Sequence, residues 1–230
     1  MAIPKINFPI YGIIILLSLI IGGCYILYNL KEKIKENNNI LFFFLFFFIF
    51  PILFGKMYTY ILSMGKIPLL EAGLSSYGGL LGIMFGAFVF EKILPYNNEI
   101  IKYSIISLTL IYSISKIGCF IAGCCYGIPY NGLFAVTYPS IPETSLFPIQ
   151  IVETISFFIL FLVCNHFKKN KYILYIVVIT ASTLKLLLDF LRYEHIDKMI
   201  SSNQIFSIIL IVITIILFIY NYKKNKTSNN

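Results

Sequence analysis

The sequence predicts an all-α polytopic membrane protein, with seven transmembrane helices in a single integral-membrane domain that covers residues 1–230. Two observations favour this fold class. Hydrophobic residues make up 59% of the chain and charged residues only 12%, about half the charged fraction of soluble domains. Apolar runs long enough to cross a bilayer, which takes about 20 residues, recur along the whole chain. The net charge of +8 therefore indicates orientation in a membrane, and we expect no nucleic-acid partner.

Short polar linkers separate the seven apolar runs, and none is long enough to form an independent domain. The longest linker is Gly118–Phe147. The expected spans are Pro9–Leu30, Ile40–Ser63, Tyr77–Pro95, Ile100–Ile117, Pro148–Phe167, Tyr172–Arg192 and Asn203–Tyr222.

The lysines of the linkers predict the orientation of the chain. Linkers after the first, third, fifth and seventh spans hold 11 lysines, whereas the N-terminus and the other linkers hold 3. Cytoplasmic segments of membrane proteins are enriched in lysine and arginine. We therefore expect the N-terminus outside and the C-terminus in the cytoplasm.

Several charged residues fall inside the expected spans, all in the half of the membrane that this orientation places outside. An ionised side chain in the hydrocarbon costs at least ~2.5–3.5 kcal/mol and usually marks a function. Four cations and two carboxylates would form a positive site for an anionic head group, such as a phospholipid phosphate. The residues are Lys56, Lys116, Lys185, Arg192, Glu153 and Asp189.

Two simpler interpretations of these charges stay open. Lysines near the end of a span can extend to the membrane surface. Lys185, Asp189 and Arg192 are spaced i, i+4, i+7, which places them on one helical face where they could form an internal ion pair.

The stretch Lys116–Gly127 contains one lysine, three glycines and three cysteines after an apolar run. We expect a glycine-rich turn that begins after Ile117 and holds Lys116 at the membrane surface. A disulfide among Cys119, Cys124 and Cys125 is possible if the turn faces an oxidising compartment. The chain has no C-x-x-C pair, and no histidine lies near this stretch, so we expect no metal site and no cofactor.

Polar residues also open three of the expected spans on the outer side. Ser75 to Gly79 offers hydroxyls and helix N-terminal amides at the start of the third span. Gln150 and Glu153 share one face of the fifth span, and Ser202–Gln204 begins the seventh, where these residues could simply act as caps. His195 lies in an outer loop, and a loop histidine is usually solvated.

Taken together, these motifs resemble the prolipoprotein diacylglyceryl transferase family over most of the chain. Ser76–Gly82 is similar to the family's His-Gly-Gly motif. Lys116–Gly123 resembles its signature loop, Arg-x-Gly-Asn-Phe. Pro148–Glu153 resembles Pro-x-Gln-Leu-Tyr-Glu, and Lys185–Arg192 resembles the Arg-x-x-x-Glu-Phe-x-Arg helix.

The resemblance implies an enzyme that moves the diacylglyceryl group of phosphatidylglycerol, or a similar anionic phospholipid, onto the thiol of a lipobox cysteine in an exported preprolipoprotein. Glycerol phosphate leaves, no cofactor is needed, and the enzyme is a multi-pass protein of the bacterial inner membrane. The catalytic residues it implies are Tyr77, Lys116 and Lys185. Those implied to bind substrate are Lys56, Gly78, Gly79, Gly118, Cys119, Cys124, Gln150, Glu153, Asp189, Arg192 and Gln204.

The chain departs from the family pattern at several of these positions. Tyr77 stands where the family has histidine, and a phenol is a weak base at neutral pH. The family has arginine at three positions that are lysine here: Lys56, Lys116 and Lys185. Lysine keeps the positive charge but cannot form the bidentate hydrogen bonds of arginine. Cys119 replaces the signature asparagine, Cys124 replaces an acid, and Asp189 replaces glutamate. We therefore expect Tyr77 to orient the lipid donor and the positive charges to favour the thiolate.

Two other functions stay open at this point. A divergent or inactive family member could bind the phospholipid and use another acceptor. A small transporter could also carry a charged pocket, although the charges gather in one leaflet and not at the midplane, where alternating access usually places its site.

Overall fold

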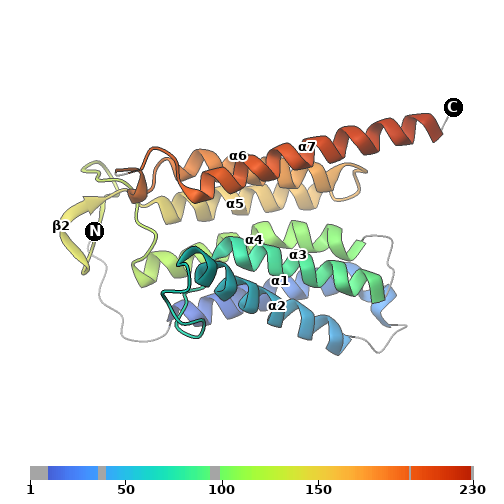
Figure 1. Cartoon of the computed structure of the whole chain (residues 1–230), viewed down its shortest axis with the longest axis horizontal. Coiled ribbons are helices and arrows are strands. Elements are labelled where there is room, and N and C mark those ends of the chain that lie inside the picture. The colour runs from blue at the N-terminus through green and yellow to red at the C-terminus, as the bar shows by residue number, and fades with distance from the viewer. Residues whose placement is uncertain (1–9, 36–39, 94–98, 197, 229–230) are drawn as a thin grey trace. The chain divides into compact units, whose positions relative to one another are not determined.

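The computed structural model describes residues 10–35, 40–93, 99–196 and 198–228. These residues form seven α-helices, one short 3-10 helix and one two-stranded antiparallel hairpin (Figure 1). The expected span ends Pro9 and Pro95 lie outside the described residues. In order, the elements are α1 (Ile10–Lys35), α2 (Ile40–Leu62), α3 (Ser76–Ile93), α4 (Glu99–Ala122), β1 (Val136–Tyr138), β2 (Ile141–Leu146), α5 (Ile149–His166), α6 (Ile173–Asp189), η1 (Tyr193–Ile196) and α7 (Ser202–Ser228).

The helical architecture confirms the expected fold class in its coarse form. Among the described residues, four helices are long and apolar enough to cross a membrane. They are Ile10–Lys31, Glu99–Ala122, Ile149–His166 and Ser202–Lys224. The hairpin between α4 and α5 is an element that the hydropathy pattern did not predict.

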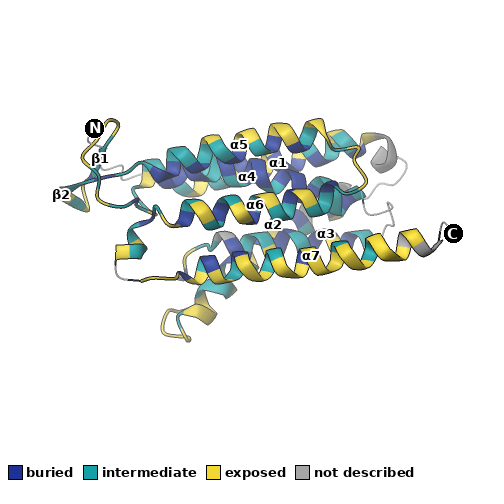
Figure 2. Ribbon diagram, turned by 90° about the horizontal axis from the view of Figure 1, so that it is seen from above, coloured by how far each residue is buried: buried dark blue, intermediate teal, exposed yellow. Residues whose placement is uncertain are grey.

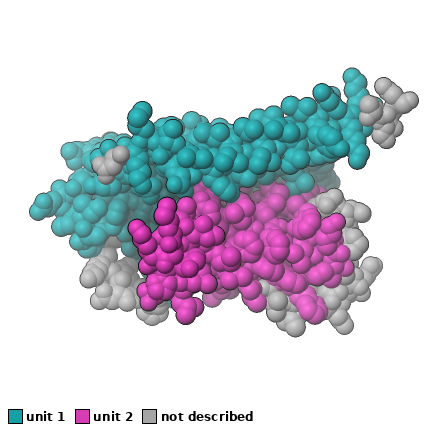
Figure 3. All heavy atoms as spheres, in the orientation of Figure 1, with its two compact units in different colours: residues 1–15, 113–230 teal, residues 16–112 magenta. Residues whose placement is uncertain are grey.

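The chain divides into two compact units (Figure 3). The first unit comprises Met1–Ile15 and Ser113–Asn230, and the second comprises Leu16–Tyr112. Helices α1 and α4 therefore contribute residues to both units.

In the second unit, α2 packs on α3 through glycines that bring the two backbones together. A Cβ atom on Gly82 would lie 2.3 Å from the Phe50 carbonyl oxygen, and one on Gly78 would lie 2.3 Å from the Phe54 carbonyl oxygen. Such contacts are shorter than any real carbon–oxygen approach, so both positions require glycine. This close packing uses small residues as membrane helices commonly do.

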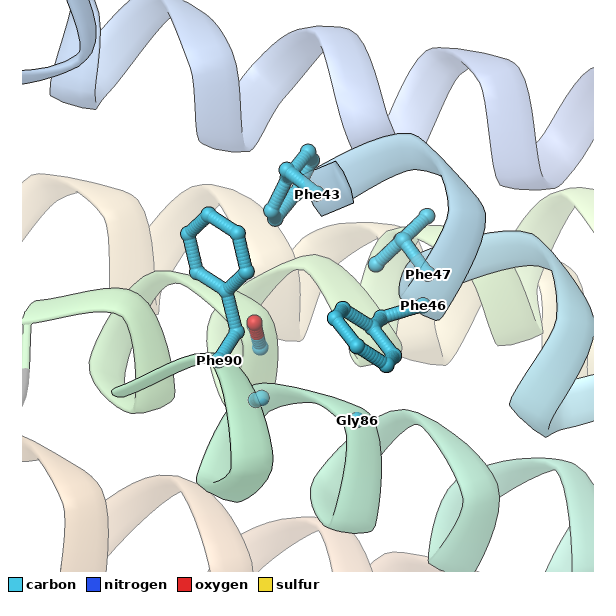
Figure 4. A pocket seen from close by; sticks show the side chains of 7 residues that line it. Phe43, Phe46, Phe47, Gly86 and Phe90 are labelled. Atoms are coloured by element: carbon cyan, nitrogen blue, oxygen red, sulfur yellow. The ribbon is translucent and has the colours of Figure 1, made fainter. Parts of the chain in front are cut away.

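A small pocket in the second unit has a largely aromatic lining (Figure 4). Its walls come from α2, α3 and α4, and the Phe43 and Phe90 rings meet edge to face with centroids 5.6 Å apart. The pocket belongs to the apolar packing of this unit. The lining residues are Phe43, Phe46, Phe47, Gly86, Ala87, Phe90 and Ser104.

In the first unit, α6 packs against both α5 and α7. Along α7, large apolar side chains such as Ile205, Ile209 and Ile216 are exposed over most of the helix surface (Figure 2). In water such a surface would be costly, because apolar area stabilises a protein only when it leaves water. In a bilayer it would face lipid, which agrees with the hydropathy of this helix.

The β1–β2 hairpin closes one end of the first unit over a small apolar cluster. Val136, Tyr138 and Leu146 are almost fully buried, and Phe120 and Tyr126 pack against them. Burial raises the pKa of Tyr138 to about 12, so this phenol stays neutral at physiological pH. The hairpin thus anchors the segment that follows α4 to the start of α5.

Candidate functional site

A buried chain of ion pairs joins α4, α5 and the end of α6 in the first unit. Glu153 of α5 holds two cations: Lys116 Nζ lies 3.0 Å from Oε2, and Arg192 Nη2 lies 2.7 Å from Oε1. The Nε atom of Arg192 lies 3.3 Å from Oδ1 of Asp189, at the end of α6. The relative exposure of these side chains is between 1% and 8%. Removing such charges from water costs several kcal/mol per ion, so the mutual pairing is needed to keep them ionised.

Asp189 connects this chain of charges to the start of the last helix. Its Oδ2 atom accepts a short hydrogen bond from the Ser201 hydroxyl and lies 3.4 Å from Nε2 of His195. Asn203 Nδ2 approaches Oδ1 at 3.4 Å. One carboxylate thus contacts an arginine, a histidine and a serine that follow it within twelve positions.

Ser201 and Gln204 fix the start of α7 through a reciprocal cap. The Gln204 N–H donates to Ser201 Oγ, and the Ser201 N–H donates to Gln204 Oε1, each at 3.1 Å. This is the capping-box arrangement, which satisfies two of the unpaired amides at a helix start. The sequence predicted capping by Ser202–Gln204; Gln204 does take part, and its partner is Ser201. The cap also aims the Ser201 hydroxyl at Asp189.

Backbone pairing ties the segment after α4 to the segment after α6. The Ile128 N–H donates to the Leu191 carbonyl and the Tyr193 N–H to the Tyr126 carbonyl, both at 3.0 Å. Gly127 lies opposite Arg192 in this pairing. A Cβ atom on Gly127 would lie 2.2 Å from the Phe147 carbonyl oxygen, so glycine is required there. This pairing holds Arg192 in place beyond the last turn of α6.

The charges of the cluster do not cancel. Counted as formal charges, Lys116, Lys185 and Arg192 contribute three positive charges against two negative charges from Glu153 and Asp189, a formal net charge of +1. Lys185 of α6 is 9% exposed, and its charge interacts with those of the other four residues. A buried site with excess positive charge favours an anionic ligand.

Two buried glutamines supply polar groups beside the charges. Gln150 Nε2 donates to the Cys124 carbonyl at 2.7 Å, while Gln204 accepts from Ser201 as described above. Within the described residues, Gln150 Oε1 and Gln204 Nε2 have no hydrogen-bond partner. Buried amide atoms nearly always find one, so these two atoms are available to a ligand or to water.

Three cysteine sulfurs gather beside the cluster at the end of α4. The Sγ atoms of Cys119, Cys124 and Cys125 all lie within 4.8 Å of one another. Hydrogen bonds from the Cys119 and Cys124 thiols, supported by the Lys116 and Arg192 charges, lower the pKa of Cys125 below its ordinary value. One of the three sulfurs therefore ionises before the other two.

The structure corrects the expected geometry around Lys116. Helix α4 does not end after Ile117 but continues to Ala122, so Lys116, Gly118 and Cys119 lie inside the helix. Gly118 allows close packing with α1: a Cβ atom there would lie 3.2 Å from side-chain atoms of Ile14. Lys116 is consequently buried inside the protein, with 3% of its surface exposed.

Arg192 and His195 also differ from expectation. Helix α6 ends at Asp189, so Arg192 lies after the helix and not on its face, although it still pairs with Asp189. The expectation that His195 is a solvated loop residue is wrong, because only 9% of its side chain is exposed. Asp189 and His195 are six positions apart and α6 ends between them. Helical periodicity does not apply across this helix end, so the sequence did not reveal their pairing.

The remaining candidate residues belong to the second unit. Lys56 of α2 donates a hydrogen bond to the Leu70 carbonyl in the loop before α3. Tyr77 is 4% exposed and packs near Tyr58, with ring centroids 6.3 Å apart. The Gly79 N–H donates to the Ser75 carbonyl at 2.9 Å, and Gly78 contacts α2. Their expected roles in substrate binding therefore stay predictions.

Comparison with known proteins gives a consistent result. A family model described as prolipoprotein diacylglyceryl transferase matches residues 1–220. A phosphatidylglycerol–prolipoprotein diacylglyceryl transferase of Dehalococcoides mccartyi is 25% identical over 183 residues, which cover 74% of this chain and 69% of the relative. A protein of the same description from Clostridium tetani is 29% identical over 161 residues, covering 64% of this chain and 63% of the relative. The chain thus spans about two thirds of the length of these relatives.

Proposed function

The chain belongs to the prolipoprotein diacylglyceryl transferase family, and from that premise we propose that it transfers a diacylglyceryl group from phosphatidylglycerol to the cysteine thiol of an exported prolipoprotein. The observation that supports this function best is the buried cluster of three cations and two carboxylates in the first unit. Its excess positive charge suits the phosphate of an anionic phospholipid, which is the donor named for the relatives.

The reaction breaks one bond and forms one. The thiol sulfur attacks the terminal glyceryl carbon of the diacylglyceryl group, and a thioether bond forms. The bond between that carbon and the phosphate oxygen breaks, and glycerol phosphate leaves with the electron pair. The thiol loses its proton, so the site must bind an anion, stabilise a leaving phosphate and accept one proton.

We assign the phosphate to Lys116, Lys185 and Arg192. Positive groups that are fixed before the reaction stabilise the charge that develops on the leaving oxygen. Glu153 and Asp189 keep Lys116 and Arg192 in position through contacts of 3.0 and 3.3 Å. Each carboxylate contacts a different nitrogen of the Arg192 guanidinium: Glu153 contacts Nη2 and Asp189 contacts Nε. Arg192 therefore supplies a positive charge and also fixes the geometry of the site.

We assign the proton to His195. Histidine changes charge between about pH 5 and 8, which suits a general base at neutral pH. Asp189 lies 3.4 Å from Nε2 and itself accepts a hydrogen bond from Ser201. The carboxylate therefore orients the imidazole ring, as the aspartate does in Ser-His-Asp triads. Glu153 and Asp189 are engaged with cations and are weaker candidates for the base.

Two glutamine side chains and several residues of the second unit have further proposed roles in binding the lipid donor. Gln150 Oε1 and Gln204 Nε2 offer one acceptor and one donor to the donor lipid's head group. From the resemblance, we also propose that Tyr77, Gly78, Gly79 and Lys56 of the second unit take part in donor binding. Cys119 and Cys124 occupy signature positions and are considered with Cys125 below.

The membrane topology that goes with this function is seven spans in one integral-membrane domain, with the N-terminus outside and the C-terminus in the cytoplasm. The four apolar helices identified above supply four of the spans. Helices α2, α3 and α6 supply the other three. The lysine distribution supports the orientation, and an exported acceptor favours the bacterial inner membrane as the location.

Transfer of labelled diacylglycerol from phosphatidylglycerol vesicles to a lipobox peptide tests the function. We expect transfer by the purified full-length protein, and rescue of a strain depleted of its own diacylglyceryl transferase. A peptide whose cysteine is replaced by serine should accept nothing. Phospholipid binding without transfer or rescue would contradict the proposed activity and favour a family member that uses another acceptor.

A further inference from the structure

The three cysteines at the end of α4 have an arrangement that phosphate binding does not explain. Cys119 is buried, Cys124 is partly buried and Cys125 is exposed, and their sulfurs lie within 4.8 Å of one another. A thiolate binds a metal ion at about 2.3 Å, so three sulfurs around one three-coordinate ion stand about 4.0 Å apart. A small rotation about the Cα–Cβ bonds therefore brings all three sulfurs onto a single ion.

The backbone after α4 is shaped in a way that brings these sulfurs together. Gly123 adopts φ +63° and Cys125 adopts φ +56°, a left-handed conformation that residues with a side chain rarely adopt. The Cys124 N–H donates to the Cys119 carbonyl at 3.1 Å, which turns the chain back over the last turn of the helix. Gln150 fixes the same turn by donating to the Cys124 carbonyl. Unusual backbone at a non-glycine residue is characteristic of functional sites.

We propose that Cys119, Cys124 and Cys125 form a binding site for one thiophilic metal cation, and that Cu(I) is the cation that suits these donors best. Soft thiolate donors select Cu(I), zinc and iron–sulfur centres over hard cations. Structural zinc sites almost always have four protein ligands. Within the described residues, the group comprises three thiols and no histidine or carboxylate, which fits a three-coordinate Cu(I) ion.

The surrounding charges are compatible with bound thiolates. Three thiolates and one Cu(I) ion carry a net charge of −2, and Lys116 and Arg192, whose charges act on Cys125, lie close enough to offset it. On binding, three S–H bonds are exchanged for three S–Cu bonds, and three protons pass to water. The oxidation state of the metal does not change.

The site was not apparent from the spacing of the cysteines. Zinc and redox motifs usually place two cysteines in a C-x-x-C pair, whereas the spacing here is C-x-x-x-x-C-C. The helix end at Ala122 and the left-handed residues after it bring Cys119 together with Cys124 and Cys125. The proposal does not depend on the transferase activity, because it rests on the sulfur positions alone.

Competition for Cu(I) with a coloured chelator tests the site. The full-length protein is purified in detergent, reduced, and titrated under anaerobic conditions against the Cu(I)–bicinchoninate complex. We expect one Cu(I) per chain. Loss of a residue that only hydrogen-bonds a metal ligand typically weakens metal binding about 10–100-fold. Loss of a ligand itself should cost no less, so Cys119→Ser, Cys124→Ser and Cys125→Ser should each weaken Cu(I) binding at least about tenfold. The matched control is the double variant Cys24→Ser/Cys164→Ser, which leaves the three sulfurs in place and should bind as tightly as the native chain.

Alkylation of the native protein provides a second test that needs no folded variant. With Cu(I) bound, iodoacetamide should leave Cys125 unmodified, whereas in the reduced, metal-free protein it should modify this residue, as mass spectrometry of the peptides would reveal. Modification of Cys125 at the same rate with and without Cu(I) would overturn the proposal. Equal affinity in the serine variants, or a disulfide among the three cysteines that persists after reduction, would overturn it as well. The affinities for zinc and for Cu(I) should each be compared with those of a reference peptide that has three cysteines. If the protein exceeds the peptide by a larger factor for zinc than for Cu(I), the preference for Cu(I) is refuted.

Discussion

The Nε2 atom of His195 lies 3.4 Å from Oδ2 of Asp189, so the last helix-forming residue of α6 orients a histidine that follows it by six positions. Asp189 is 1% exposed and also accepts a hydrogen bond from Ser201. A carboxylate held in this way has little freedom, and neither has the imidazole that pairs with it. This relationship leads to the first prediction.

His195→Gln should lower the transfer rate by about two to four powers of ten, the usual contribution of a general base. Glutamine can still donate a hydrogen bond to Asp189 but cannot accept a proton at neutral pH. His166→Gln is the control, since His166 lies in the last turn of α5. Transfer by His195→Gln at the native rate would exclude the assigned role.

Lys185→Ala should weaken use of the lipid donor, because it removes one of three buried positive charges from the phosphate site. We expect the concentration of phosphatidylglycerol needed for half-maximal transfer to rise about tenfold or more, the effect of a lost hydrogen bond to a charged group. Lys185→Arg keeps the charge and should be tolerated. The exposed Lys66→Ala serves as the comparison. If Lys185→Arg and Lys185→Ala are equally impaired, the charge is not what matters at this position.

Glu153→Gln should destabilise the folded protein. The carboxylate contacts both Lys116 and Arg192, and removal of one partner from a buried ion pair typically costs about 3–5 kcal/mol. Thermal unfolding in detergent measures the loss, with exposed Glu143→Gln in β2 as a matched control. Similar unfolding temperatures for the two variants would mean that the ion pairs add little to stability.

Gly82→Ala should separate α2 from α3. The new methyl group would lie 2.3 Å from the Phe50 carbonyl oxygen, and overpacking of this kind typically costs about 1–3 kcal/mol. Gly12→Ala makes the same chemical change on α1, where no atom lies within 4 Å of the added carbon. That control should be neutral or slightly stabilising, because alanine favours helix more than glycine does. A Gly82→Ala variant as stable as Gly12→Ala would refute the close contact.

Tyr77→Phe tests the role that the family resemblance gives to this residue. Loss of one hydrogen-bond donor that stabilises a reacting oxygen typically lowers a rate by about two to three powers of ten. Binding of phosphatidylglycerol should change little, as measured with vesicles under conditions without the acceptor peptide. Tyr77→His should retain or raise the activity. Unchanged transfer by Tyr77→Phe would rule out the donor-orienting role.

Hydropathy predicted the helices well because each needs only a local property, a run of apolar residues about 20 long. It also identified Lys116, Glu153, Asp189 and Arg192 as unusual, since ionised residues rarely occur inside such runs. What it could not supply was the pairing. Glu153 and Arg192 are separated by 39 positions, and no local pattern specifies which buried cation a carboxylate meets.

The errors arose where tertiary contacts override local preference. Gly118 was expected to begin a turn, yet α4 continues to Ala122, and Gly118 instead allows a close approach of Ile14. The break after Asp189 is held by backbone pairing with Ile128, and a periodic pattern cannot anticipate such pairing. His195 was missed for the same reason, because its partner lies on the other side of that break.

The ion-pair chain has a consequence for how the protein is made. Lys116 and Glu153 are synthesised before Asp189, Arg192 and Ser201, because a chain grows from its N-terminal end, at about 5–20 residues per second. Until the segment after α6 has been made, we therefore expect Glu153 to have Lys116 as a possible partner but not Arg192. Chains truncated before α6 should be recognised by membrane quality control and degraded, because they expose this incomplete ionic cluster.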